Sequence, residues 1–197
     1  MSESDGEGGE ETAGREAVVL DFLAHGRSDD DRPQYQKSPV AYALGTGDFR
    51  LYEFTADRDA DVGIGDRVVV EPAGERDPVV ETLREVDYGG LSGGAQSELE
   101  YAVEDLVAEN ERRFVDFYND AQPVTLRLHQ LNLLPGIGKK LRNGILDERK
   151  RKPFESFEEL TDRVQGLHDP EGIVVDRIME ELREDDLKYR IFARREE

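Results

Sequence analysis

A Leu-Leu-Pro-Gly-Ile-Gly-Lys-Lys stretch at residues 133–140 carries the clearest chemical signal in the sequence. Pro135 has no amide hydrogen, and Gly136 and Gly138 readily adopt positive φ, so a helix cannot run through these residues. We expect a turn, followed by a helix that begins with unpaired amides. These amides and the positive end of the helix dipole favour an anion, and the two lysines that close the stretch flank that site.

The order hydrophobic-Pro-Gly-hydrophobic-Gly-basic resembles the helix-hairpin-helix motif, which contacts a nucleic-acid backbone without reading its bases. We expect its two helices at Thr125–Asn132 and Lys139–Arg151. In modules of this kind the turn amides donate to phosphate oxygens, and neighbouring carbonyls often hold a monovalent cation that bridges to the same phosphate. By position, the amides of Gly136, Gly138 and Lys139 would donate, and a potassium ion would face the carbonyls of Asn132, Leu134 and Ile137.

The likeness implies a set of candidate nucleic-acid-binding residues along this hairpin. Lys139, Lys140 and Arg142 would add charge-assisted contacts to neighbouring phosphates, and the later basic run either reaches a second strand or faces solvent. The competing interpretation is an inert connector between helices, but the coincidence of motif and positive charge favours binding. The complete set is Pro135, Gly136, Ile137, Gly138, Lys139, Lys140, Arg142, Arg149, Lys150, Arg151 and Lys152.

The charge distribution supports this interpretation. The chain carries 46 acidic and 26 basic residues, a formal net charge of −20, yet residues 123–152 hold eight basic and two acidic residues. Only six lysines occur in the chain, and four of them lie between positions 139 and 152. The acidic excess elsewhere resembles that of proteins from extremely halophilic microbes, which we interpret as adaptation to the solvent. An ordinary acidic protein from a low-salt organism is the alternative.

Several classes of protein are excluded by composition. The chain contains no cysteine, which excludes disulfides and thiolate zinc sites. No apolar run is long enough to span a membrane, and the acidic N-terminus does not have the pattern of a secretory signal. We therefore expect a cytoplasmic protein with no membrane partner.

The first half of the chain is typical of a small β domain. Residues 1–15 have almost nothing to bury and are predicted to be a disordered acidic tail. Short strands at regular spacing then predict a closed barrel of the OB or SH3-like kind over residues 16–95. In Phe49–Phe54 the alternation of apolar and polar residues suggests a half-buried strand. The five strand candidates are Ala17–Leu23, Val40–Leu44, Phe49–Phe54, Arg67–Glu71 and Val79–Val86.

The second half is predicted to be helical, so the fold class is α+β. A core-packing helical connector is expected over residues 96–122, mainly one helix at Gln96–Asn119. A tandem helix-hairpin-helix domain follows over residues 123–187, and residues 188–197 form a C-terminal strand or tail. The second hairpin carries acidic residues in its turn, which repel phosphate, so we assign it a structural role. Its helices are expected to begin at Ser156, an N-cap with Glu159 as capping-box partner, and at Ile173.

Several segments together resemble one protein family. They are Leu-Asp-Phe-Leu-Ala-His-Gly-Arg at 20–27, Gly-Glu-Arg-Asp at 74–77, Glu-Arg-Arg-Phe-Val-Asp-Phe at 111–117, residues 128–140 around the glycine turn, and Pro-Phe-Glu-Ser-Phe-Glu-Glu-Leu at 153–160. Their order is similar to that in the archaeal domain-of-unknown-function family 655, described as nucleic-acid- or RNA-binding. The resemblance covers about residues 17–192. It implies an OB-like region joined to a tandem helix-hairpin-helix domain and no established activity.

Enzymatic alternatives fit the sequence less well. Base-excision glycosylases also carry a Leu-Pro-Gly-hydrophobic-Gly hairpin, but their catalytic aspartate follows about 20 residues later, where this chain has Phe154–Glu158. A nucleotide-binding P-loop needs four residues between its glycines and a Ser or Thr after the lysine. The three histidines are too scattered for a recognisable metal site, and His129 is interpreted as a packed or surface residue.

The sequence therefore predicts a non-enzymatic protein that binds DNA or RNA through its phosphate backbone, largely independently of sequence. No cofactor is expected beyond the potassium ion at the hairpin. The alternative is a protein–protein adaptor in a ribosome- or repair-associated complex, in which a hairpin helix docks a partner.

Overall fold

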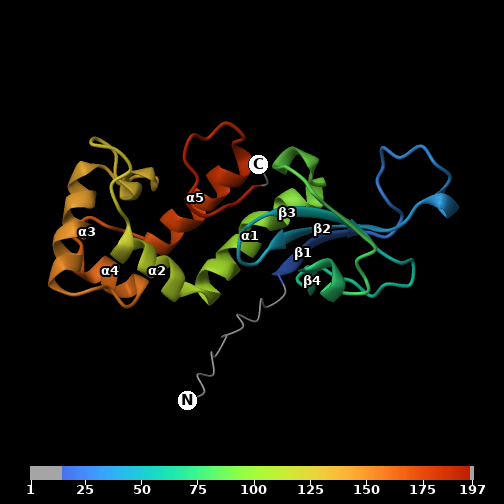
Figure 1. The fold of residues 1–197 in the computed structure, drawn as a ribbon, viewed down its shortest axis with the longest axis horizontal. Coiled ribbons are helices and arrows are strands. Elements are labelled where there is room, and N and C mark those ends of the chain that lie inside the picture. Colours follow the sequence, from blue (N-terminus) through green and yellow to red (C-terminus); the bar gives the residue numbers. More distant parts are fainter. Residues whose placement is uncertain (1–14, 196–197) are drawn as a thin grey trace, which may run out of the picture.

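The computed structural model describes residues 15–195 and shows a β domain followed by five helices (Figure 1). This confirms the predicted α+β class. The strands are β1 (Arg15–Leu23), β2 (Val40–Gly45), β3 (Leu51–Thr55), β4 (Arg67–Glu71) and β5 (Thr82–Glu85). The helices are α1 (Gly93–Glu109), α2 (Glu111–Asp120), α3 (Lys139–Arg151), α4 (Phe157–Arg163) and α5 (Pro170–Arg183). Residues 1–14 of the predicted acidic tail and the final residues 196–197 lie outside the described residues.

The five strands form one antiparallel sheet in the order β4-β1-β2-β3-β5. The sheet curls into a half-barrel, and its edge strands β4 and β5 are not paired with each other, so the ring stays open. Helix α1 packs along one face of the sheet, mainly against β1 and β2 (Figure 1). Within residues 15–195, no helix is long and apolar enough to cross a membrane.

Both faces of the central strands are buried. Val40, Tyr42 and Leu44 of β2 belong to the core shared with α1, whereas Ala41 and Ala43 belong to a second core on the opposite face. The neighbouring strand β3 behaves in the same way, and even Glu53 is only 8% exposed. The predicted half-buried strand is therefore wrong on this point, because loops cover the face that the alternation of residues assigned to solvent.

The predicted helix Gln96–Asn119 is two helices that meet at Asn110. Asn110 ends α1, and its side-chain Nδ2 donates to the carbonyl of Leu106 at 2.8 Å. That hydrogen bond satisfies one of the last carbonyls of α1 and releases the chain into a new direction for α2. The change in direction lets α1 cover the sheet while α2 packs into the helical domain (Figure 1).

The predicted helix Thr125–Asn132 is wrong. Pro123 and His129 instead form an isolated antiparallel bridge, and residues 124–128 make a tight turn between them. The Thr125 hydroxyl accepts hydrogen bonds from the amides of Arg127 and Leu128, which competes with helical pairing. Only a short 3-10 helix, Gln130–Leu133, precedes the glycine turn.

The second hairpin agrees with its prediction more closely. The Ser156 hydroxyl accepts from the Glu159 amide at 3.0 Å and caps α4. The Glu159 carboxylate reaches back to the amide of Glu155 rather than to that of Ser156, so the capping box is shifted by one residue. The apolar faces of α3, α4 and α5 meet in the same core as α1 and the sheet, which makes the core continuous through the molecule.

The C-terminal segment returns from α5 to the sheet (Figure 1), and residues 188–195 form no strand, so only the predicted alternative of a tail holds for them. Phe192 packs against the rings of Phe114 and Phe117, with centroid separations of 5.5 and 5.1 Å. The Arg194 amide donates to the carbonyl of Asp48 at 2.9 Å. A strand cannot form here because the amides of residues 191–193 are committed to a buried carboxylate.

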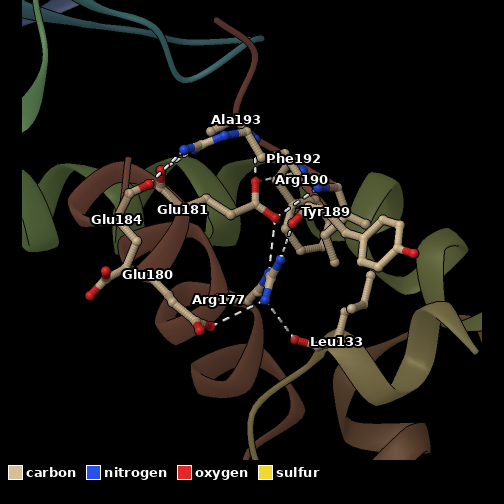
Figure 2. Close-up of polar contacts among 10 residues, drawn as sticks. Leu133, Arg177, Glu180, Glu181, Glu184, Tyr189, Arg190, Phe192 and Ala193 are labelled. Carbon is tan, nitrogen blue, oxygen red and sulfur yellow. Dashed lines mark hydrogen bonds and ion pairs between the residues drawn. The ribbon is translucent and has the colours of Figure 1, made fainter. Parts of the chain in front are cut away.

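That carboxylate belongs to Glu181, which is completely buried (Figure 2). It accepts the amides of Ile191, Phe192 and Ala193 at 2.7 to 3.0 Å and the Nε of Arg177 at 2.9 Å. The Arg177 guanidinium also donates to the carbonyls of Leu133 and Tyr189. One buried ion pair on α5 therefore holds both the C-terminal segment and the residue that leads into the glycine turn.

We predict that Glu181→Ala lowers the free energy of unfolding by about 3–5 kcal/mol, because Arg177 and three backbone amides lose their buried acceptor. Chemical denaturation in concentrated potassium chloride measures this. The matched control is Glu180→Ala, which removes a 41% exposed carboxylate from the same guanidinium and should cost less than about 1 kcal/mol. Equal losses in the two variants would contradict the prediction.

Candidate nucleic-acid interface

The glycine turn leaves the start of α3 uncapped. Gly136 has φ +77°, which only glycine adopts readily, and Gly138 is the N-cap residue without a side chain to offer. The first hydrogen bond of the helix runs from the Arg142 amide to the Gly138 carbonyl at 3.0 Å. Within residues 15–195, the amides of Gly136, Gly138 and the first three residues of α3 have no acceptor. These amides are available to an external anion.

The surface over these amides is open. A Cβ atom built on either Gly136 or Gly138 would meet no other atom of the described chain within 4 Å. Their neighbour Ile137 is buried, and its amide donates to the carbonyl of Leu134 at 3.2 Å. The turn is therefore anchored by its apolar residue while its two glycines face outward, which allows a phosphate group to approach the backbone closely.

Two polar side chains brace the turn from behind. The Asn132 Nδ2 donates to the Ile137 carbonyl at 3.2 Å, and the Arg142 Nη1 donates to the Asn132 Oδ1 at the same distance. The Arg177 Nη1 also donates to the Leu133 carbonyl, at 3.1 Å (Figure 2). These contacts fix the turn geometry before any ligand binds, which reduces the entropy lost on binding.

The carbonyls of Asn132, Leu134 and Ile137 are the predicted ligands of a potassium ion, and hydrogen bonds within the chain occupy part of the capacity of two of them to accept. The Leu134 and Ile137 carbonyls each accept one hydrogen bond from the chain. Because a carbonyl oxygen has two lone pairs, each retains capacity for a second partner. The potassium ion remains a prediction.

Three of the predicted basic side chains are free to contact a ligand. Lys139, Lys140 and Lys150 are exposed, and their ammonium groups form no hydrogen bond or ion pair with residues 15–195. Lys139 and Lys150 are separated by three helical turns and share one face of α3. Lys152, the C-cap of the helix, is also exposed but lies near enough to Glu159 to lower the pKa of that carboxyl.

The predicted arginines have other partners. The Arg149 Nη1 donates to the Tyr118 carbonyl at 3.1 Å, near the end of α2. Arg151 pairs with Glu148 at 3.2 Å, one turn earlier on the same helix, and Arg142 braces the turn through Asn132. Arg149 therefore has a structural role, and Pro135, which is partly buried, shapes the turn. Periodicity alone did not distinguish arginines that face the protein from lysines that face solvent.

His129 also has a role that the sequence analysis did not assign. It is 8% exposed, and its Nδ1 accepts the amide of Leu131 at 3.1 Å, which caps the 3-10 helix before the turn. Burial lowers the pKa of His129, and the nearby guanidinium groups of Arg149 and Arg142 lower it further. The position of a histidine directly before a short helical segment is a capping signal, although a weak one.

The second hairpin shows what a capped turn looks like. Asp169 has φ +49°, and its carboxylate accepts the Gly172 amide at 3.0 Å at the start of α5. This helix N-terminus is already neutralised by the protein's own carboxylate. The two hairpins therefore differ at the start of their second helix. In the second hairpin a carboxylate of the protein caps the helix, whereas in the first hairpin no described side chain caps it and an external anion has room to bind.

The lowered pKa of His129 gives a pH prediction. As the pH falls through the ordinary histidine pKa of about 6.5, the unfolded chain binds a proton that folded His129 resists, so the free energy of unfolding decreases. His129→Asn keeps a good capping residue and should reduce this decrease between about pH 7.5 and 5.5. Thermal unfolding across that range measures it. His168→Asn, which changes an exposed histidine, should leave the wild-type pH dependence intact; a similar effect in both variants would argue against His129.

Comparisons with known proteins establish the family of the chain. Residues 13–194 match the family model described as "Protein of unknown function (DUF655)". The chain is 38% identical over 179 residues to the uncharacterized protein MJ0038 of Methanocaldococcus jannaschii, covering 90% of this chain and 79% of that protein. The crystal structure of Af1531 from Archaeoglobus fulgidus superposes with a TM-score of 0.82 at 40% identity, covering 91% of this chain and 99% of that one. The chain therefore belongs to the DUF655 family.

Proposed function

We propose that this protein binds nucleic acid without catalysing a reaction on it, through the phosphate backbone and the first hairpin. The observation that carries the proposal is the uncapped start of α3, where unpaired amides, open glycines and exposed lysines coincide. A helix N-terminus attracts anions in any protein, but here the adjoining side chains carry the same preference in a chain whose net charge is −20.

The contacts follow from the groups present. Amides of the turn donate to the oxygens of one phosphate, and Lys139 and Lys140 contact that phosphate or the next one. Lys150 extends the basic face along α3 by about 16 Å from Lys139. Backbone amides and ammonium groups recognise phosphates regardless of the bases they connect, so binding is largely independent of sequence.

The acidic composition of the rest of the chain suggests binding at a high salt concentration. If the protein works in concentrated salt, release of counterions contributes little and lysine–phosphate attraction is strongly screened. Short directional hydrogen bonds from a prearranged turn then supply a larger share of the affinity. We propose this division of labour for a halophilic setting, and a collapse of affinity between moderate and molar potassium would count against it.

The lysines can be tested against a control of identical charge. Lys139→Glu/Lys140→Glu should weaken binding about a hundredfold, since two charge-assisted contacts become repulsive. Lys37→Glu/Lys188→Glu changes the net charge equally but on lysines outside the hairpin, and should bind within about threefold of the wild type. Titrations against duplex DNA, duplex RNA and single strands at several potassium concentrations measure both. A folded wild type that binds none of these would favour the adaptor function instead.

The turn can be tested by giving it the cap of the second hairpin. Gly138→Asp should satisfy the amides with a carboxylate, as Asp169 does, and leave stability unchanged or higher by a few tenths of a kcal/mol. Binding should nevertheless fall sharply, because the anion site is occupied. Gly138→Asn offers a neutral cap of the same size and should have an intermediate affinity. If Gly138→Asp binds as tightly as the wild type, the turn amides are not the site.

A further inference from the structure

The loop that joins α2 to the 3-10 helix presents an apolar residue at its tip. Leu126 has a relative exposure of 107%, the highest among the exposed large apolar residues of the described chain. It lies within the helix that the sequence predicted at Thr125–Asn132. In the structure it projects into solvent from the turn over residues 124–128, and no part of the described chain covers it.

The tip is held firmly despite its exposure. The amides of Val124 and Thr125 both donate to the Leu128 carbonyl, at 2.7 and 3.0 Å. The Thr125 hydroxyl accepts two further amides from inside the turn, and the Gln122 and Gln130 backbones pair at its base at 2.9 Å. A loop with this many internal hydrogen bonds holds the Leu126 backbone in one place, which lowers the entropy lost when the side chain makes a contact.

The loop stands next to the proposed phosphate site. Figure 1 shows it beside the end of α3 where the glycine turn lies. His129, at the base of the loop, is close enough to Arg142 for that guanidinium to lower its pKa, and Asn132 connects Arg142 to the turn. The base of the loop is therefore joined to the glycine turn through these side chains.

The chain segment that contains the loop and the glycine turn lacks the acidic residues found elsewhere in the sequence. No Asp or Glu occurs between Asp120 and Asp147, whereas 46 of the 197 residues of the chain are acidic. The interval contains the loop, the glycine turn and the first half of α3, and its charged residues are Arg127, Lys139, Lys140 and Arg142. A protein that keeps carboxylates on its solvated surfaces has removed them here, and charge complementarity identifies the partner as a polyanion.

From these observations we propose that Leu126 contacts the bases of the bound nucleic acid while Arg127 and the glycine turn hold phosphates on either side of it. This inference rests on the proposed function and deepens it by naming the ligand. A leucine side chain gains nothing from a phosphate, and the apolar surfaces of a nucleic acid are the faces of its bases. The ligand is therefore a strand whose bases are accessible, as in single-stranded segments and loops, rather than a fully stacked duplex.

The decisive experiment uses strands that contain 2-aminopurine, whose fluorescence reports base stacking. We expect the wild type to change this fluorescence in a single strand and to leave that of a perfect duplex nearly unchanged. Leu126→Ser should weaken binding to the single strand about tenfold, the effect of withdrawing one leucine from an apolar contact. At saturating protein the fluorescence change should be lost with Leu126→Ser but retained with Lys139→Glu/Lys140→Glu.

The dependence of affinity on salt concentration distinguishes the apolar contact of Leu126 from the charged contacts of Lys139 and Lys140. The ratio of wild-type to Leu126→Ser affinity should stay constant or rise with potassium chloride, whereas the ratio for the lysine variant should shrink as charge is screened.

Tyr101→Ser is the matched control, because Tyr101 is an exposed apolar residue on α1 and has acidic neighbours. It should bind as the wild type does. Thermal unfolding should be unaffected by Leu126→Ser, since the side chain is fully exposed.

The outcomes distinguish this inference from the proposed function. If the lysine variant loses binding while Leu126→Ser matches the wild type in affinity and fluorescence, phosphate binding stands and the base contact is overturned. An equal fluorescence change in the perfect duplex would overturn the preference for accessible bases. If the folded wild type binds no nucleic acid, the proposed function fails and the inference fails with it.

Discussion

The buried ion pair between Arg177 and Glu181 holds together the parts of the molecule on which the candidate site depends. Glu181 binds three consecutive amides of the C-terminal segment, and Arg177 binds the carbonyl that precedes the glycine turn (Figure 2). The segment then packs Phe192 between α2 and the sheet. Because Glu181 is completely buried, losing Arg177 would leave its charge without a cationic partner, and losing Glu181 would leave three backbone amides without their acceptor.

The two hairpins differ in what they contribute: the second stabilises the structure, and the first leaves a helix N-terminus open. The second hairpin caps its own helix with Asp169, and its helix α5 supplies the ion pair that steadies the first. The first leaves the N-terminus of α3 without a cap, which costs stability because several amides go without an internal acceptor. The shared apolar core and the Arg177 contact to Leu133 offset that cost, so the open turn keeps its shape.

Residues 121–146 contain no Asp or Glu, so this part of the chain is positively charged although the net charge of the protein is strongly negative. An overall charge of −20 disfavours polyanions at long range, yet the glycine turn presents free amides and exposed ammonium groups, and the loop before it carries an exposed leucine. Salt shortens the reach of the unfavourable long-range field and leaves close directional and apolar contacts largely intact. On the proposed function, these groups would therefore still bind a polyanion in concentrated salt.

The sequence by itself determined the sheet strands, the extent of α3 and the glycine turn, because these depend on local signals such as β-branched runs, helical periodicity and residues with special backbone freedom. It did not determine the loop at residues 123–129, where one threonine hydroxyl and a proline outweigh a leucine pattern that suits a helix. Nor did it separate Arg149, which binds an α2 carbonyl, from Lys150, which faces solvent. Only the tertiary structure decided the role of Arg149, which binds a carbonyl 31 residues earlier in the chain. It also decided the burial of the Arg177–Glu181 pair, which lies within one helix but is bound to Leu133, Tyr189 and residues 191–193.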